Sequence, residues 1–274
     1  MVCHTLDPAM PVLLRPDGTV QVGWDPRRAV LVRPPDGLSC SALAELLRAM
    51  QDGVSTDDLA TLADARGLTD LDALIGALNS AGVLHIDSPA PEHRSAAIRI
   101  HGRGPLSDLL AGALRCSGSR IATSRLGHAS ATADLVVLSD FLVADPRVVR
   151  ELQAARVPHL PVRIRDGVGL IGPLVLPGVT ACLNCCDLHR GDRDAAWPAV
   201  AAQLQGAVGT ADRATVLATA AVALDQVSRV IDAVRGHRRG DQPPPTLNTT
   251  LEFDVGTRTT VLRRWSRHPR CGCR

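Results

Sequence analysis

The sequence predicts an α/β protein with a small N-terminal domain and a larger, doubly wound α/β domain. Three observations predict this fold. Short strand patterns followed by helical patterns fill the first 88 residues, and strand and helix patterns then alternate. One strand, DLVVL, is a continuous apolar run after its first residue, as in a parallel sheet covered on both faces. A proline-containing linker, Ser88–His93, separates the two parts, so we place the domains at residues 1–88 and 94–274.

The smaller domain is expected to begin with three strands. Pro11–Arg15 and Val20–Trp24 flank the sequence Pro-Asp-Gly-Thr, which favours a hairpin turn, and Ala29–Arg33 is the third strand pattern. Three amphipathic helices follow, and the residues expected to cap them are Ser39, Ser55 or Thr56, and Thr69. A last short strand is expected at Val83–Ile86. This order is typical of a winged-helix-like module.

The larger domain is expected to open with a strand at Ala97–His101, a glycine-containing turn and a helix from about Leu106 to Arg115. Its buried strand is Asp134–Leu138. The elements predicted after it are a helix at Arg147–Ala155, a strand at His159–Arg165, a hairpin at the edge of the sheet at Gly167–Leu176, a long helix at Ala211–Gly236, and strands at Thr246–Asp254 and Thr257–Arg263. Alternating strands and helices predict a sheet with helices packed on it.

The composition excludes several activities. The formal net charge of +2 over 274 residues is too balanced for charge alone to indicate a nucleic-acid or membrane partner. The sequence contains no lysine and no tyrosine, which excludes a Walker-type lysine, a Schiff-base lysine and a tyrosine general acid. No basic-then-apolar leader is present and no apolar run approaches the ~20 residues of a membrane span, so we expect a cytoplasmic protein.

The cysteines favour a metal site. Cys182 and Cys185 form a C-x-x-C pair, and Cys271 and Cys273 form a C-x-C pair. Two such pairs can complete a tetrahedral thiolate shell, so we predict one structural zinc ion held by these four residues, with Cys186 as the alternative ligand. A redox-active C-x-x-C pair, a disulfide and unconnected structural cysteines are the other interpretations.

The first glycine turn of the larger domain has the context of a dinucleotide or ATP turn, because Gly102 and Gly104 follow a strand and precede a helix. Pro105, however, removes a backbone N–H that would face phosphate. Asp140 follows the buried strand, where α/β sheets place ligand-binding groups. We take Gly102, Gly104 and Asp140 as a degenerate nucleotide site. A tight strand-to-helix turn, with Asp140 capping a helix before Phe141, is the other interpretation.

Further along, the sequence resembles a known family. The residues that carry the resemblance are Gly172–Gly178 (GPLVLPG), Thr180–Cys185 (TACLNC), the charged run Asp187–Asp194 (DLHRGDRD) and Trp197-Pro198. With the glycine turn and the DLVVL strand, they look like the ThiF/MoeB and ubiquitin-activating-enzyme fold. More specifically, they resemble the ThiF-like partner proteins of azole-forming (TOMM) cyclodehydratases. The resemblance covers Pro11 to Arg274 and implies an N-terminal winged-helix clamp for a leader peptide, with a separate YcaO-type enzyme as partner.

The resemblance also shows what this sequence lacks. Active adenylyltransferases of this fold carry an arginine-bearing segment that contacts the ATP phosphates. Here only Ala122–Ala133 lies before the buried strand, which is too short for that segment, and Asp140-Phe141 stands where those enzymes have Asp-Asn. The resemblance therefore implies a zinc-containing scaffold that has lost ATP chemistry. The run Asp187–Asp194 fits either a solvated, salt-bridged turn or a functional cluster.

The expected function is leader-peptide binding. The peptide would add a strand to the sheet edge formed by Ala29, Val30, Leu31 and Val32. The expected partners are the precursor leader peptide and a YcaO-type enzyme, with no nucleic acid and no membrane, while a homodimer is left open. A ThiF-like ATP-dependent adenylyltransferase is the alternative function. A winged-helix DNA-binding regulator is disfavoured, because Asp70 and Asp72 on the third helix would repel phosphates.

Overall fold

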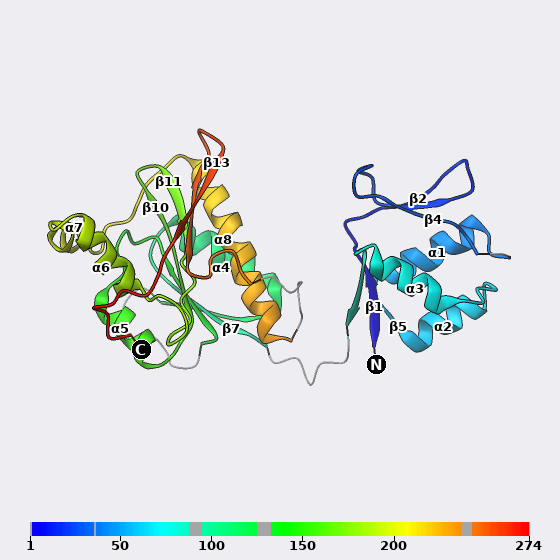
Figure 1. Ribbon diagram of the computed structural model, residues 1–274, viewed down its shortest axis with the longest axis horizontal. Coiled ribbons are helices and arrows are strands. Elements are labelled where there is room, and N and C mark those ends of the chain that lie inside the picture. Colours follow the sequence, from blue (N-terminus) through cyan, green and yellow to red (C-terminus); the bar gives the residue numbers. More distant parts are fainter. Residues whose placement is uncertain (1, 36, 88–94, 125–132, 237–242, 274) are drawn as a thin grey trace. The chain divides into compact units, whose positions relative to one another are not determined.

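The computed structural model describes residues 2–35, 37–87, 95–124, 133–236 and 243–273. The chain divides into two compact units, Met1–Glu92 and His93–Arg274 (Figure 1). The first unit has one hydrophobic core, and the second has a core on each face of its sheet. Each unit therefore buries its own apolar side chains.

Two three-stranded antiparallel sheets build the first unit. One has the order β5-β1-β6, and its strands are β1 (Cys3–Leu6), β5 (Val54–Ser55) and β6 (Leu84–Asp87). The other has the order β2-β3-β4, and its strands are β2 (Val12–Leu14), β3 (Val20–Val22) and β4 (Val30–Val32). The second sheet was predicted. Strands β1 and β5 were missed, because CHTL and VS are too short to show an alternation of apolar and polar residues.

Three helices complete the first unit, and their bounds are Cys40–Gln51 (α1), Thr56–Asp64 (α2) and Leu71–Ser80 (α3). The predicted caps Ser39 and Ser55 are confirmed, since each side chain accepts a backbone N–H at its helix start. The predicted cap at Thr69 is wrong. Asp70 caps α3 instead, because its carboxylate accepts the N–H of Ala73 at 2.9 Å.

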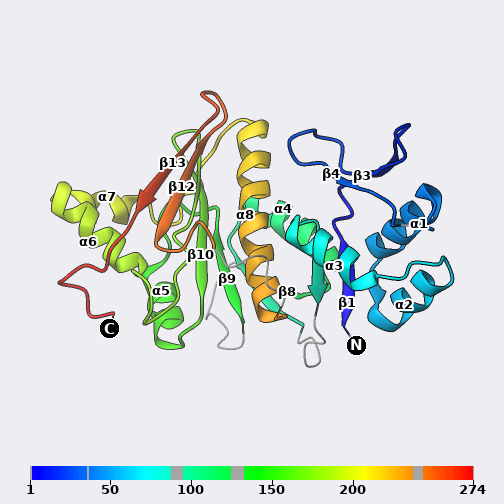
Figure 2. The same cartoon turned by 45° about the vertical axis from the view of Figure 1, so that its right-hand side comes forward.

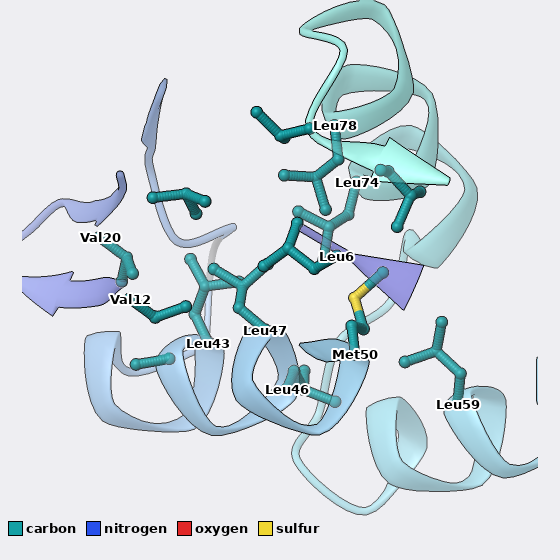
Figure 3. Packing of buried hydrophobic residues seen from close by; sticks show 14 of the residues in the cluster. Leu6, Val12, Val20, Leu43, Leu46, Leu47, Met50, Leu59, Leu74 and Leu78 are labelled. Carbon is teal, nitrogen blue, oxygen red and sulfur yellow. The ribbon is translucent and has the colours of Figure 1, made fainter. Parts of the chain in front are cut away.

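One face of α1 forms the centre of the first core (Figure 3). Leu43, Leu46, Leu47 and Met50 recur at helical spacing, and all four are buried. Leu6 of β1 packs into the same cluster, so the strand that the sequence did not reveal is held in place by this core. Burying one such side chain stabilises the fold by roughly 1.5–3 kcal/mol.

A seven-stranded sheet with the order β13-β12-β11-β10-β9-β7-β8 runs through the second unit. Its strands are β7 (Ala97–His101), β8 (Arg120–Ser124), β9 (Leu135–Ser139), β10 (His159–Arg165), β11 (Val168–Ile171), β12 (Thr249–Asp254) and β13 (Thr259–Arg264). Strands β8, β7, β9 and β10 are parallel, and β10 to β13 are antiparallel. The hairpin predicted at Gly167–Leu176 is present, since β11 pairs antiparallel with β10, but its predicted place at the edge is wrong, because β11 lies between β10 and β12.

Helices cover both faces of this sheet, as the doubly wound prediction requires. On one face lie α4 (Pro105–Leu114) and α8 (Arg213–Val234), and on the other lie α5 (Pro146–Ala154), α6 (Leu183–Arg193) and α7 (Trp197–Gln203). Figure 1 and Figure 2 show these two layers on either side of the strands. The mixed α/β fold is thereby confirmed.

The long helix α8 is apolar and long enough to cross a membrane by composition alone. In the structure it packs against α4 and β11. Ala220, Ala223, Val227 and Ile231 are buried in the core on that face. A core helix passes the same composition test, and α8 is such a helix.

Candidate metal centre

Four cysteine thiols come together beside the start of α6. Cys182 is the N-cap of α6 and Cys185 lies in its first turn, whereas Cys271 and Cys273 lie in the segment after β13. The Sγ atom of Cys182 lies 3.7 Å from that of Cys185 and 3.6 Å from that of Cys271. The Sγ atoms of Cys185 and Cys273 are 3.4 Å apart. All four sulfur atoms lie within 4.8 Å of one another, so the two predicted pairs converge.

These distances fit a bound metal ion. Four thiolates at about 2.3 Å from one zinc ion lie roughly 3.8 Å apart in a tetrahedron. A disulfide needs a distance of about 2.05 Å, so the distances exclude the disulfide interpretation. Cys186 does not belong to this group of sulfur atoms, and it is buried in the neighbouring core instead. Four sulfur donors fill a tetrahedral shell, which leaves no position for a catalytic water.

The thiols differ in their electrostatic surroundings. Burial raises the pKa of Cys182 above its ordinary value. A reactive cysteine of a redox pair at a helix start has a lowered pKa, so this shift argues against the redox interpretation. Burial would also raise the pKa of Cys271, but hydrogen bonds from Asn184 and from the backbone of Cys273 outweigh it and lower that pKa to about 7. The Asn184 Nδ2 atom lies 3.2 Å from the Cys271 sulfur.

A polar network fastens the segment after β13 to α6, and the sequence did not reveal it. His268 is buried, and its Nε2 atom lies 2.7 Å from Oδ2 of Asp192. Arg270 pairs with the same carboxylate. The hydrogen bond from His268 and the charge of Arg270 hold the pKa of Asp192 below its ordinary value. This network fixes the position of Cys271 and Cys273 relative to the C-x-x-C pair.

The charged run Asp187–Asp194 is not a turn, because α6 continues through it as far as Arg193. His189 lies with Asp192 and His268, and their ligand atoms form a second group within 4.8 Å of one another. His189 is not a member of the four-cysteine group. Its ring lies edge-on to that of His268, with centroids 4.7 Å apart.

The glycine turn is bonded to the end of β9. The backbone N–H groups of Leu106 and Ser107 donate to the two carboxylate oxygens of Asp140 at 3.0 and 3.1 Å, and the Ser107 hydroxyl also donates to Asp140. Asp140 therefore caps a helix, in agreement with the alternative interpretation, and that helix is α4. Since Asp140 is only 1% exposed, the protein's own carboxylate occupies the helix N-terminus at which a phosphate would bind.

The turn needs glycine at both positions, because its backbone lies very close to Ser139 and Asp140. A Cβ atom on Gly102 would lie 2.3 Å from the carbonyl oxygen of Ser139, and one on Gly104 would lie 2.7 Å from the Asp140 carboxylate. The structure thus brings Gly102, Gly104 and Asp140 together, and packs them closely within the turn. The alternative of a tight strand-to-helix turn accounts for these contacts.

The predicted peptide-binding strand lies at a sheet edge. In the order β2-β3-β4, the strand β4 pairs with β3 and with no other strand among the described residues. Leu31 is 55% exposed, whereas Val30 and Val32 are half-buried against the core. Ala29 precedes the strand, and its N–H bonds to the carbonyl oxygen of Asp25 at 2.7 Å.

No family model matches this sequence, and no curated protein matches it. Solved structures do match. The chain is similar to the heterocyclase TruD, with a TM-score of 0.67 and 16% identity over 100% of this chain and 43% of TruD. It is also similar to a heterocyclase in complex with substrate and cofactor, with a TM-score of 0.69 and 15% identity over 100% of this chain and 39% of the other.

A third similar structure matches over its full length. E. coli MccB with ATP has a TM-score of 0.60 and 12% identity, and the match covers 99% of both chains. MccB is described as a microcin C7 biosynthetic enzyme in its complex with N-formylated MccA. At these identities the likeness shows the fold, and it confirms the ThiF-like resemblance at that level. The chain spans about two fifths of the length of the two heterocyclase chains.

Proposed function

We propose that this chain is a leader-peptide-binding scaffold that presents a precursor peptide to a separate YcaO-type enzyme and has no ATP chemistry of its own. The domain predicted at residues 1–88, which lies within the unit Met1–Glu92, would act as a winged-helix-like clamp. The observation that carries the proposal is the open edge of β4, in a chain that shares the fold of a heterocyclase solved with its substrate. An extended peptide can add a strand to such an edge.

The two edges of the β2-β3-β4 sheet are not equivalent. Side chains of α1 cover the β2 edge, since Arg48 donates to the carbonyl oxygen of Val12 at 3.1 Å and Gln51 donates to that of Met10 at 2.8 Å. Among the residues that the structure describes, no side chain bonds to the backbone of β4. The β4 edge is therefore the better docking edge.

The register identifies the backbone groups that a peptide would meet. Hydrogen bonds from Arg15 N–H to Thr19 and from Gly23 N–H to Pro11 close the two ends of the β2–β3 ladder. Antiparallel ladders alternate, so Val20 and Val22 direct their backbone groups toward β4. They pair with Val32 and Val30. Leu31 is then the β4 residue whose N–H and C=O point outward, available to a peptide strand.

The test is a titration of the full chain with candidate leader peptides, followed by backbone amide chemical shifts. Leu31→Pro removes the outward donor and should weaken binding by about tenfold or more, because edge strands tolerate proline while losing that hydrogen bond. Leu31→Ala keeps the donor and is the matched control. Val30→Pro would instead break the internal ladder and the fold. Shifts confined to another surface, or shifts caused by duplex DNA, would contradict the proposal.

We also propose that the metal of the four-cysteine site is zinc with a structural role. The donor set is all sulfur, which suits Zn²⁺, and it leaves the ion no open position. The sulfur atoms of Cys182, Cys185, Cys271 and Cys273 supply every bond of the shell. This role is compatible with a scaffold.

An ATP-dependent adenylyltransferase is the second candidate, and the full-length match to MccB, solved with ATP, favours it. The Asp140 carboxylate at the start of α4 disfavours it, since a phosphate there would meet a negative charge. Pyrophosphate exchange separates the two functions. We expect no exchange with any carboxylate substrate, and robust peptide-dependent exchange by the isolated chain would establish the enzyme.

A further inference from the structure

The second unit contains a cavity of about 980 Å³, lined by residues of β10 to β13, α5, α6 and α7. Six arginines and four carboxylates line it, so its walls carry an excess of positive charge. Most of these charges are paired. Arg190 lies 2.8 Å from Asp187, and Glu252 accepts from Arg165 at 3.2 Å and from Arg263 at 2.8 Å.

Arg163 is different. Among the described residues, its side chain forms no hydrogen bond and no ion pair, although it lies in the middle of the sheet on β10 and is half-buried. Desolvation, followed by the nearby charge of Arg190, lowers the pKa of Arg163 to about 10, and the charge of Asp187 opposes this shift only in part. The guanidinium is still protonated at neutral pH. A buried charge without a partner is costly, so a missing counter-ion would stabilise it.

Arg190 is held rigidly beside it. Its guanidinium lies over two indole rings, 5.2 Å from the centroid of Trp197 and 4.9 Å from that of Trp265. Trp197 also donates its indole N–H to Asp187 at 3.2 Å, and Asp187 pairs with Arg190. Only 2% of the chain is aromatic, and two of its three tryptophans are placed around this one arginine. Such preorganisation is typical of a binding site.

We propose that this cavity binds a small anionic ligand, whose phosphate or carboxylate group lies between Arg163 and Arg190. Planar guanidinium groups match both oxyanions by paired hydrogen bonds. The apolar wall formed by Leu142, Leu170 and Pro173 would receive the non-polar part of the ligand. The site lies within the second unit and does not depend on leader-peptide binding by the first.

A second cavity lies next to the first and adds further space for a ligand. It measures about 780 Å³, lies at the carboxyl ends of β7 and β9, and is lined by His101 and Arg103. Arg163 lines both cavities. A ligand whose anionic group reaches Arg163 can therefore extend into either one.

The experiment uses the indole N–H resonances of the full chain. Trp197 and Trp265 line the first cavity and report on it, while Trp24 is in the other unit, is 81% exposed and serves as an internal control. Phenyl phosphate tests the phosphate source and N-acetylleucine tests the carboxylate source. N-acetylleucinamide is the uncharged control for the second probe. We expect saturable shifts of Trp197 and Trp265 with one anionic probe and no shift of Trp24.

The matched variants are Arg163→Gln and Arg147→Gln, since Arg147 is exposed on α5 and lines neither cavity. Arg163→Gln should weaken binding of the responding probe by about tenfold, as expected for loss of a charged hydrogen bond. Arg147→Gln should leave it unchanged. If neither anion shifts the two resonances, or if Arg163→Gln binds as the parent does, the proposal is wrong. An unchanged spectrum of the free Arg163→Gln variant shows that it is folded.

Discussion

Asp140, which is buried, and Arg163, which is half-buried, carry charges in the same sheet, after β9 and on β10, but their surroundings differ. Asp140 receives two backbone N–H groups and a serine hydroxyl. Arg163 receives no partner among the described residues, and it faces a cavity. A charge that the chain satisfies by itself is structural, whereas a charge left to an outside partner marks a place where that partner can bind.

The four thiols of the candidate metal centre are an intermediate case, because the chain gathers them and leaves the compensating charge to an ion. We expect Cys271→Ser to lose the metal and to lower the free energy of unfolding by about 5 kcal/mol or more, since metal affinity is folding free energy at such sites. Elemental analysis measures the metal content and should give about one zinc per chain in the parent. Urea unfolding measures the free energy of unfolding. Cys186→Ser, outside the sulfur group, should keep the metal. Full metal retention in Cys271→Ser would remove that residue from the shell.

The next largest effect is expected at Asp140, whose carboxylate is hydrogen-bonded within the chain. Asp140→Ala leaves two buried N–H groups at the start of α4 without an acceptor, so we expect a loss of about 3 kcal/mol in the free energy of unfolding. Asp145→Ala removes an exposed cap from α5 and should cost only about 1 kcal/mol. Urea unfolding of both variants measures the two losses in free energy. Equal losses would show that the turn does not need Asp140.

A third titratable group, His159, is buried in its neutral form, so the fold does not bear the cost of burying a charge there. Its ring is fully buried, and desolvation lowers its pKa to about 4. The unfolded state, with an ordinary pKa of about 6.5, therefore binds the proton first, and stability that is present above pH ~6.5 is lost as the pH falls toward 4.

We expect the parent to lose about 1 kcal/mol per pH unit more than His159→Asn in this window. Unfolding free energies between pH 7 and pH 4.5 measure the difference. Parallel curves for the two proteins would show that the pKa of His159 is the same in the folded and unfolded states.

The smallest effect is expected at Arg163, and it has the opposite sign. Without a ligand, Arg163→Gln should raise the free energy of unfolding by about 1 kcal/mol, because it removes a desolvated charge that forms no ion pair among the described residues. Thermal unfolding in chloride buffer measures it. Arg165→Gln is the control and should not stabilise, since Arg165 is paired with Glu252. A destabilised Arg163→Gln would mean that the fold itself satisfies this cation.

Patterns of period and spacing predicted much of this molecule. The apolar run DLVVL predicted β9, and the two cysteine pairs predicted the converging thiols. Both depend on short stretches of chain. The strand order did not follow from such stretches, so β11 was placed at an edge although β12, some 80 residues later, pairs with it.

The charged sites show the same limit. The sequence indicated that Asp140 and the glycines belong to one site, but not that Asp140 bonds to α4 itself. Arg163 looks like any arginine in a strand, since the lack of a partner is a property of distances in three dimensions. Trp197-Pro198 was noted only as part of a family resemblance, and its contact with Arg190 gave no local signal.

The cysteine pairs also tie together parts of the chain that are far apart in sequence. Cys182 and Cys271 are separated by 89 residues, and α7, α8, β12 and β13 all lie between them. An ion bound to both pairs closes this long loop, and the chain-entropy cost of closing a loop of that length in the unfolded state is about 4–5 kcal/mol. Part of the ion's stabilisation would therefore act by restricting the unfolded chain, and a chelator would remove that restriction.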